Sequence, residues 1–345
     1  MRKIKVVVAD DSSYMRQVIT KTLASDEMIE IIAAVSNGKE AVSVTAEKKP
    51  DVLVLDIEMP EMDGIQVLKS VLRDFPLPVI MLSSFSRDSA KVMLSLEIGA
   101  VDFVRKPGHS ISLADIKDEL IQKVKAAASA SIGMGLADIK SVQHGSAVST
   151  RKIVAIAAST GGPSALCQVI PVFPAKLSVP VIVIQHMPEN FTRSLADRLQ
   201  QMSRLSVKES EDGEEILSGV VYVAKGGHHT RIEAKNGSKY VRLTKEPAVN
   251  GVRPAADVTF RDIADVYGKG VIAAVLTGMG EDGALGAVNI RTAGGTVIAQ
   301  DQETSTIYGM PKAVAARNAA DFVLPLACIP AKIVELVDSV KNCTA

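Results

Sequence analysis

The sequence predicts two α/β domains within one chain of 345 residues. Short apolar segments alternate with helix-like segments in two separate series, and small and polar residues separate the two series. The length also allows each series a hydrophobic core of its own. We expect a first domain over residues 1–125, a linker over 126–150 and a second domain over 151–345.

The first series contains five apolar segments of strand length, and helical patterns lie between them. The predicted strands are 4–9, 30–34, 52–55, 79–82 and 102–104, and the predicted helices are 13–24, 38–48, 64–73, 87–98 and 113–127. This alternation predicts a five-stranded parallel sheet covered on both faces. Such a sheet has a crevice at the carboxyl ends of its strands, where the strand order reverses.

The second series predicts another doubly wound, mostly parallel α/β domain. Its predicted strands are 153–158, 181–185, 220–224, 240–243, 271–276 and 296–299. The stretch from about 206 to 245 has the pattern of β-hairpins inserted into this domain. The preceding linker is indicated by alanine, serine and glycine in place of the regular alternation.

Composition excludes several classes of function. The chain has 39 Lys plus Arg and 39 Asp plus Glu, so no overall positive field favours nucleic acid as a partner. No apolar run approaches the ~20 residues of a membrane helix, and no signal peptide is apparent, so we expect no membrane insertion. Three scattered cysteines suit a reducing compartment. We expect a cytoplasmic protein.

Charged side chains follow three strands of the first domain. Asp10 and Asp11 follow the first strand, Asp56 follows the third, and Lys106 follows the fifth. Any one of these could be a surface residue or a helix cap, but clustered carboxylates are best explained by a hard cation such as Mg²⁺. Asp56 would then be the nucleophile that accepts a phosphoryl group, and Lys106 would neutralise charge on that group.

This combination of residues resembles the receiver domain of two-component response regulators, which has a flavodoxin-like fold. The resemblance implies that Asp56 is phosphorylated and that Mg²⁺ is bound by Asp10, Asp11, Asp56 and the backbone carbonyl of Glu58. It also implies a supporting hydroxyl, Ser83, a supporting aromatic ring, Phe103, and a cis bond between Lys106 and Pro107.

In the second domain, three predicted parallel strands end in residues suited to acyl transfer. The strand 153–158 stops at Ser159, the next strand ends at His186, and the strand 271–276 leads to Asp282. At one sheet edge, His186 could take the proton of Ser159 while Asp282 orients the imidazole. Each residue alone has a structural explanation, because Ser159 and Asp282 could cap helices and His186 could simply be hydrogen-bonded.

A phosphate-binding loop is the competing explanation for the segment Ser159-Thr160-Gly161-Gly162. The segment lacks the G-x-G-x-x-G spacing and the Gly-Lys-Ser/Thr of nucleotide-binding loops. The second strand also ends in His186, where a ribose-binding carboxylate would be expected. These features favour a nucleophilic serine.

Several segments of the second domain resemble the chemotaxis methylesterase (CheB) family. They are 158–162, 185–188, 276–283, 300–301 and 308–311. The resemblance implies a Ser159-His186-Asp282 triad, an oxyanion contact from the Met279 backbone N–H, and Thr160 at the same site. The chain departs from the family at Val252 and Ala255, where a polar His and Ser are usual. His228 and His229 match no motif and are interpreted as hairpin surface.

The resemblance implies a protein-glutamate methylesterase and protein-glutamine glutaminase that needs no cofactor for its ester chemistry. Its substrate would be a chemoreceptor, and a chemotaxis histidine kinase would supply the phosphoryl group. Before phosphorylation of Asp56, we expect the first domain to cover the Ser159 edge. The alternatives are a second domain that only binds a phosphorylated ligand, and a DNA-binding output domain.

Overall fold

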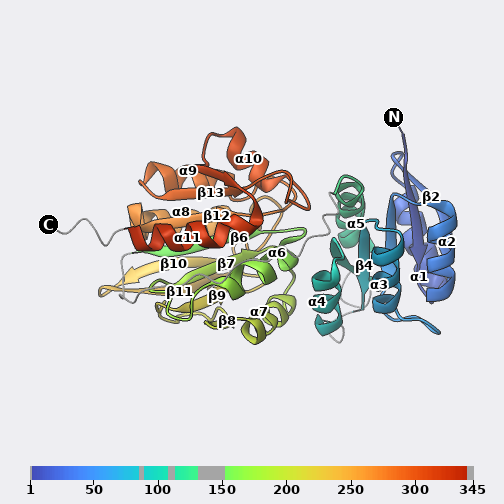
Figure 1. The fold of residues 1–345 in the computed structure, drawn as a ribbon, viewed down its shortest axis with the longest axis horizontal. Helices are drawn as coiled ribbons and strands as arrows, with labels where there is room; N and C mark the ends of the chain where they lie inside the picture. Colours follow the sequence, from blue (N-terminus) through green and yellow to red (C-terminus); the bar gives the residue numbers. More distant parts are fainter. Residues whose placement is uncertain (1, 85–88, 108–112, 131–151, 340–345) are drawn as a thin grey trace. The chain divides into compact units, whose positions relative to one another are not determined.

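The structure is a computed structural model that describes residues 2–84, 89–107, 113–130 and 152–339. By contacts between residues, the chain divides into two compact units, 1–132 and 133–345, which are treated separately below (Figure 1). No helix in the described ranges is both long and apolar enough to cross a bilayer.

The first unit is a five-stranded sheet in the order β2-β1-β3-β4-β5, and all neighbouring strands are parallel. The strands are β1 (Ile4–Ala9), β2 (Ile29–Val35), β3 (Val52–Asp56), β4 (Val79–Ser83) and β5 (Asp102–Arg105). The helices are α1 (Ser13–Ala24), α2 (Gly38–Lys48), α3 (Gly64–Asp74), α4 (Ser89–Ile98) and α5 (Leu113–Ala128). The predicted fold class is confirmed.

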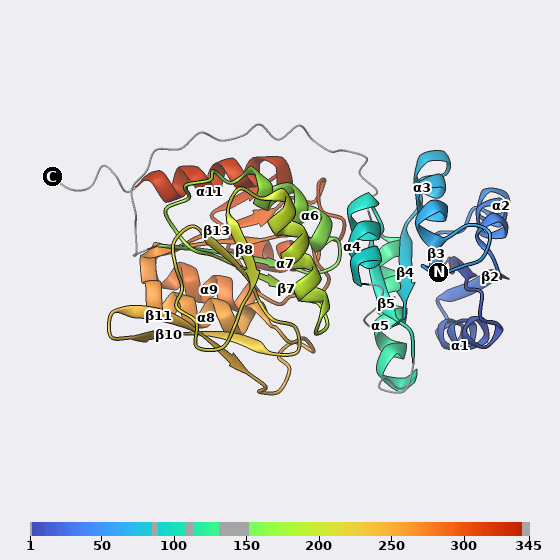
Figure 2. The same ribbon diagram turned by 90° about the horizontal axis from the view of Figure 1, so that it is seen from below.

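Local sequence explains where these elements begin and what they bury. The side chains of Ser12, Asn37 and Asp63 accept hydrogen bonds from the first turns of α1, α2 and α3. Every residue of β3 and β4 is buried, because α1 and α5 cover one face of the sheet and α2, α3 and α4 cover the other (Figure 2). The strand order reverses between β1 and β3, and this reversal places their carboxyl ends side by side.

The second unit is built on a seven-stranded sheet in the order β14-β13-β12-β6-β7-β9-β8, with parallel neighbours throughout. The strands are β6 (Ile153–Ala158), β7 (Val181–Gln185), β8 (Ser206–Glu209), β9 (Val220–Val223), β12 (Val271–Val275), β13 (Thr296–Gln300) and β14 (Phe322–Leu324). The helices are α6 (Gly162–Val169), α7 (Phe191–Met202), α8 (Ala256–Tyr267), α9 (Ala284–Thr292), α10 (Met310–Ala316) and α11 (Ile329–Asp338). Three short 3-10 turns lie at Ile170–Val172, Gly268–Gly270 and Leu326–Cys328.

The expectation of hairpins throughout 206–245 is only partly right. β10 (His229–Lys235) and β11 (Ser238–Thr244) form an antiparallel two-stranded sheet, whereas β8 and β9 are parallel strands of the main sheet. β8 lies at the sheet edge and is only partly buried, so its alternating residues resemble a hairpin strand.

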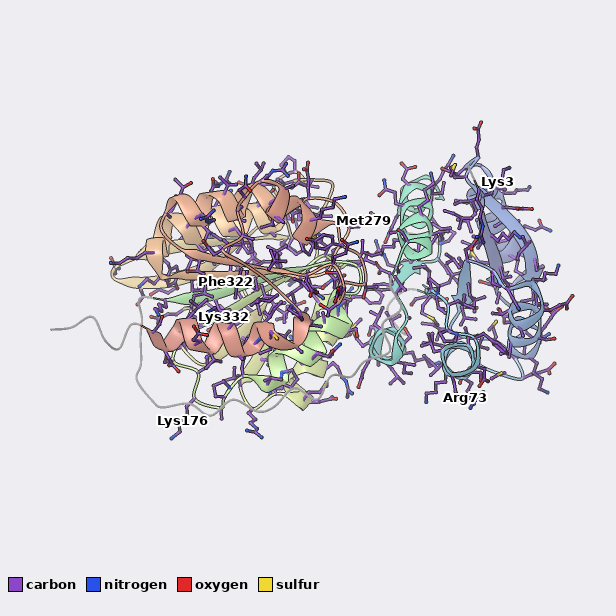
Figure 3. All side chains as sticks on the ribbon, turned by 45° about the horizontal axis from the view of Figure 1, so that its top comes forward. Lys3, Arg73, Lys176, Met279, Phe322 and Lys332 are labelled. Carbon is purple, nitrogen blue, oxygen red and sulfur yellow. The ribbon has the colours of Figure 1, made fainter. Side chains whose placement is uncertain are left out.

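The opposite edge strand, β14, was not predicted because it has three residues and none is fully buried. Its Phe322 ring is nevertheless covered by Lys332 of α11, whose Nζ lies 4.2 Å from the ring centroid (Figure 3). A short strand covered by a long cationic side chain offers little free edge for pairing with another chain.

Candidate functional sites

The charged residues of the first unit meet where the strand order reverses. Asp10 and Asp56 are almost fully buried, and the Nζ atom of Lys106 lies 2.8 Å from Asp10 Oδ2 and 2.6 Å from Asp56 Oδ2. The exposed Asp11 completes the group, because one carboxylate oxygen from each aspartate lies within 4.8 Å of the others. Three hard oxygen donors at this spacing fit a site for Mg²⁺.

Burial controls the ionisation of Asp56. Removal from water raises the pKa of its carboxyl to about 6, although the Lys106 ammonium favours the charged form. Burial alone would lower the pKa of Lys106, but the charge of Asp56 and hydrogen bonds to both aspartates raise it above its usual value. Lys106 therefore stays cationic beside the carboxylate.

The supporting residues of this site occupy the neighbouring strands. Ser83 is the last residue of β4 and is fully buried, with its Oγ donating to the carbonyl of Ser84 at 3.0 Å. Phe103 in β5 is also buried, and the Nζ of Lys123 lies 5.3 Å from its ring centroid. Glu58 follows β3, and its exposed side chain turns to Lys91, with Nζ 2.7 Å from Oε1.

The expected cis bond before Pro107 is wrong. Among the described residues, the cis peptide bond precedes Pro254 instead. The trans form of an X–Pro bond is favoured by only about 0.5–1 kcal/mol, so the dipeptide itself does not decide which form occurs.

In the second unit, hydrogen bonds between the Ser159 backbone and two neighbouring segments hold this residue at the end of β6. Its N–H donates to the carbonyl of Thr277 at 3.0 Å, and its carbonyl accepts from the Nε2 of Gln185 at 2.9 Å. Ser159 is half-buried, whereas the whole of β6 before it is buried. Ser159 thus stands at the rim of the sheet, between the ends of β7 and β12.

His186 lies beside Ser159 on the adjacent strand. Its N–H donates to the carbonyl of Ala158 at 3.1 Å, which continues the parallel register of β6 and β7. The imidazole is mostly buried, and its Nε2 lies 2.7 Å from Asp282 Oδ2. Nδ1 forms no hydrogen bond to the part of the chain that is described, so it is the ring nitrogen available for proton transfer.

The Asp282 carboxylate is almost completely buried and fully hydrogen-bonded. Oδ2 also accepts from the N–H of Ala256 at 2.5 Å, and Oδ1 accepts from the N–H of Asp257 at 3.1 Å and the Nδ2 of Asn250 at 2.9 Å. Burial alone would raise the pKa of Asp282, but hydrogen bonding and the charge of His186 lower it below the usual value. An ionised carboxylate is therefore fixed against the imidazole.

Ser159 and Asp282 do not cap the helices that directly follow them, so that explanation of the two residues is wrong. The N-cap of α6 is Gly161, at a φ of 76°, and the N-cap of α9 is Gly283. Asp282 does cap a helix, but that helix is α8, which begins 26 residues before it in the sequence. Neither residue is thus explained by the helix that follows it.

The loop between Thr277 and Asp282 packs against the serine. A Cβ on Gly278 would lie 2.8 Å from the Cβ of Ser159, so only glycine allows this approach. Met279 follows at the edge of the unit (Figure 3), and no described group accepts a hydrogen bond from its N–H. Thr160 is buried, and its carbonyl accepts from the Thr277 hydroxyl at 3.0 Å.

Four residues of this site were not identified from the sequence: Gln185, Asn250, Asp257 and Thr277. Gln185 is buried, and its Nε2 joins the carbonyls of Ser159 and His186, at 2.9 and 3.2 Å. Its position next to His186 was the available signal. For Asn250 the sequence signal was the pair Asn-Gly. This pair predicts a tight turn but gives no indication of a contact with Asp282.

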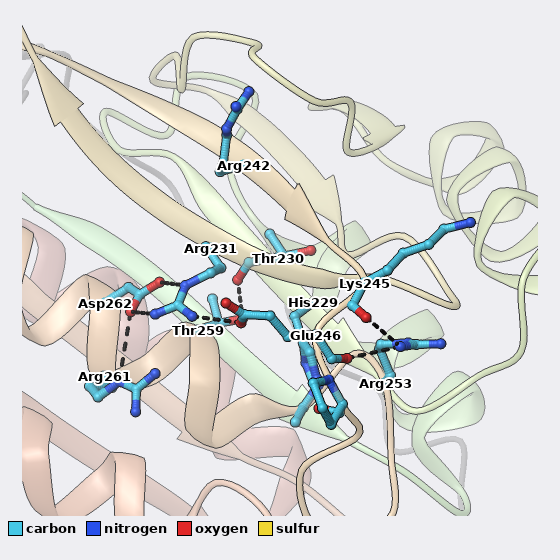
Figure 4. A network of polar contacts seen from close by, with 12 residues as sticks. His229, Thr230, Arg231, Arg242, Lys245, Glu246, Arg253, Thr259, Arg261 and Asp262 are labelled. Atoms are coloured by element: carbon cyan, nitrogen blue, oxygen red, sulfur yellow. Dashed lines mark hydrogen bonds and ion pairs between the residues drawn. The ribbon is translucent and has the colours of Figure 1, made fainter.

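Hydrogen bonds hold the loop 245–255, which leads into α8, at both ends (Figure 4). His229 is fully buried, so its assignment to the hairpin surface is wrong: its Nε2 lies 3.0 Å from the Pro247 carbonyl and its Nδ1 accepts from the N–H of Ala255. Arg253 donates to the carbonyls of Lys245 and Glu246 at 3.0 and 2.8 Å. The backbone of Ala255 therefore helps to order this loop through its hydrogen bond to His229.

Comparisons with known proteins match both units. A family model described as CheB methylesterase matches residues 154–333, and one described as response regulator receiver domain matches 6–118. A protein named protein-glutamate methylesterase/protein-glutamine glutaminase from Pyrococcus abyssi is 41% identical, and the match covers 99% of this chain and 95% of that protein. A protein of the same name from Thermotoga maritima is 42% identical, and the match covers 97% of this chain and 99% of that protein. The crystal structure of the Thermotoga maritima CheB methylesterase catalytic domain is similar with a TM-score of 0.54 and 48% identity, covering 55% of this chain and 100% of that chain.

Proposed function

The chain belongs to the CheB methylesterase family and carries a response regulator receiver domain, and we propose that Ser159, His186 and Asp282 catalyse its hydrolytic reaction. The substrate is a glutamate methyl ester on a chemoreceptor, and the products are methanol and the free glutamate. The family resemblance expected from the sequence motifs is confirmed.

The first half of the reaction transfers the acyl group to Ser159. The serine Oγ attacks the ester carbonyl carbon while His186 accepts its proton, and the ionised Asp282 stabilises the imidazolium that forms. The N–H of Met279 donates to the oxyanion of the tetrahedral intermediate. Collapse of the intermediate breaks the bond to the methoxy group, which takes the proton from His186 and leaves as methanol.

The second half of the reaction releases the receptor. A water molecule gives a proton to His186 and attacks the acyl carbon, and the Ser159 oxygen leaves with that proton. The receptor side chain becomes a carboxylate. The same steps deamidate a glutamine, with ammonia as the leaving group in place of methanol.

One observation carries this proposal: a buried Asp282–His186 pair, 2.7 Å between Oδ2 and Nε2, stands beside a serine at the next strand end. A satisfied structural histidine would not need an ionised carboxylate that is held by three further hydrogen bonds.

The receiver domain is proposed to control this activity through phosphorylation of Asp56 by a chemotaxis histidine kinase. Asp10, Asp11 and Asp56 with the backbone carbonyl of Glu58 would hold Mg²⁺, which offsets the charge of the phosphoryl oxygens when bound. Lys106 neutralises further charge, and the Ser83 hydroxyl and Phe103 ring adjust to the phosphorylated state. Phosphorylation then favours the state in which Ser159 is uncovered.

The decisive experiment measures methanol release from receptor membranes that carry glutamate methyl esters. Ser159→Ala should abolish release, whereas the matched Ser164→Ala, in the following helix, should keep it near wild type. If Ser159→Ala retains activity, the triad is wrong and the alternative of a binding module gains support. Binding of duplex DNA with a strong salt dependence would instead support a DNA-binding output domain.

Regulation is tested by the same assay with and without a small phosphodonor such as acetyl phosphate. Asp56→Ala should abolish stimulation by the donor and leave the basal rate unchanged, because Asp56 lies in the other unit from the triad. Stimulation that survives this substitution would show that Asp56 is not the control residue.

A further inference from the structure

We propose that Asn250 is a positioning residue for the esterase reaction, which fixes the Asp282 carboxylate without neutralising it. Its single amide nitrogen donates to two carboxylates, Asp282 Oδ1 and Asp257 Oδ2, at 2.9 Å each. This role rests on the proposed function, because it matters only if Asp282 acts on His186.

The backbone rather than burial sets the position of Asn250. Its side chain is exposed, but its φ of 55° and that of Gly251, 75°, form a tight turn. The turn is closed by two hydrogen bonds between Val249 and Val252, with N–O distances of 3.0 and 3.2 Å. Asparagine and glycine adopt these left-handed conformations more readily than other residues. The turn also belongs to the loop that His229 and Arg253 fasten (Figure 4).

The two carboxylates that share this amide repel one another. Burial raises the pKa of Asp257, and the charge of Asp282 raises it further, while the N–H of Gly286 and the amide of Asn250 act in the opposite direction. An amide NH₂ group has two protons, one for each carboxylate. Asn250 thus holds two negative groups at a fixed separation with a single side chain.

The neutrality of this donor suits the reaction. A lysine or arginine at this position would bind Asp282 more strongly, but its positive charge would oppose the imidazolium of His186. A neutral amide orients the carboxylate and leaves its full negative charge to stabilise that imidazolium. Removal of the amide should therefore lower kcat more than it changes KM.

The chain contains a matched control. Asn236 and Gly237 form the turn between β10 and β11, with φ values of 52° and 84°, and Asn236 is also exposed. No described residue accepts a hydrogen bond from its side chain. Asn236→Ala and Asn250→Ala therefore remove the same backbone preference, and they differ in the contacts with Asp282 and Asp257.

The test measures kcat and KM for methanol release by the full chain, with methylated receptor membranes as the substrate. Since hydrogen bonds to charged groups are the stronger kind, Asn250→Ala should lower kcat about tenfold with KM within about twofold. Asn236→Ala should leave kcat within about twofold of wild type, since it removes only a turn preference. Equal values for the two variants would overturn the proposal.

A second variant separates positioning from folding. Asn250→Asp keeps the turn preference but adds a third carboxylate to Asp282 and Asp257. The titratable contacts of Asp282 are His186 and Asp257. The added charge opposes ionisation of Asp282 and favours protonated His186, so the acid limb of kcat/KM should move to higher pH. A variant that was only less well folded would lose activity equally at every pH, which would overturn the proposal.

Ser159→Ala separates this inference from the proposed function. If that variant still releases methanol, the triad itself fails, whatever Asn250 does. If it is inactive while Asn250→Ala matches Asn236→Ala and Asn250→Asp keeps the wild-type pH profile, the positioning role alone fails.

Discussion

Replacing Asp56 with asparagine should stabilise the receiver unit at neutral pH and have much less effect in acid. The side chain is almost completely buried at the end of β3. Burial is the largest influence on its carboxyl and raises the pKa from 3.8 to about 6. Ionisation of Asp56 therefore lowers the stability of the folded state, and asparagine avoids this cost because it resembles the protonated carboxyl.

The size and sign of this change in the free energy of unfolding follow from the pKa of Asp56 in the unfolded and folded states. At 1.36 kcal/mol per pKa unit, the difference between 3.8 and about 6 corresponds to about 3 kcal/mol. The folded state holds the proton more tightly than the unfolded state. The stabilisation that the wild type gains from the protonated Asp56 carboxyl is therefore fully present below pH 3.8 and is lost as the pH rises through about 6. The free energy of unfolding of the variant should exceed that of the wild type by about 1 kcal/mol at about pH 4.5 and about 3 kcal/mol at about pH 7.5.

Amide hydrogen exchange of the full chain measures this difference within one unit. With divalent cations chelated, peptides from β3 report the receiver, and peptides from β6 serve as an internal reference. Asp74→Asn is the control, because Asp74 is exposed and a hydrogen bond from Arg73 lowers its pKa. If the extra protection from Asp56→Asn is the same at both pH values, the pKa of Asp56 is not raised in the folded state and the reasoning fails.

Two further predictions concern the esterase unit. Asp282→Asn should lower kcat for methanol release by about 10³–10⁴-fold with little change in KM, because an amide cannot stabilise the imidazolium of His186; a loss below about tenfold would contradict the triad. Gly162→Ala should lower the free energy of unfolding by about 1–3 kcal/mol in chemical denaturation and also reduce kcat. An added Cβ there would lie 2.1 Å from Gln185 Oε1 and displace the side chain that joins Ser159 to His186, so unchanged kinetics would exclude that linking role.

The features that could be predicted from the sequence are those encoded locally. β6 is an uninterrupted apolar run because helices bury both faces of a parallel sheet, and such a run is visible without any partner strand. The same rule brings Asp10 and Asp56 together, since parallel strands place their carboxyl ends at one edge. The convergence of Ser159 and His186 follows from the same rule.

The features that could not be predicted depend on contacts between distant segments. β8 has the composition of a hairpin strand and joins the main sheet only through its parallel pairing with β9. His229 resembles a surface residue until the loop 245–255 covers it. Asn250 predicts a turn, but its contact with Asp282 depends on how that loop folds over α8. Local patterns contain none of this information.

The departure at Ala255 shows how catalysis and folding are joined in this chain. Ala255 is the N-cap of α8 and has no side-chain oxygen to accept the free N–H groups of the first turn. Asp282 supplies that oxygen from the loop after β12, since it accepts from the N–H groups of Ala256 and Asp257. The positive end of the helix dipole in turn favours the ionised carboxylate. The helix that Asp282 caps therefore stabilises the carboxylate charge that supports proton transfer by His186. Loss of Asp282 should weaken both α8 and the reaction.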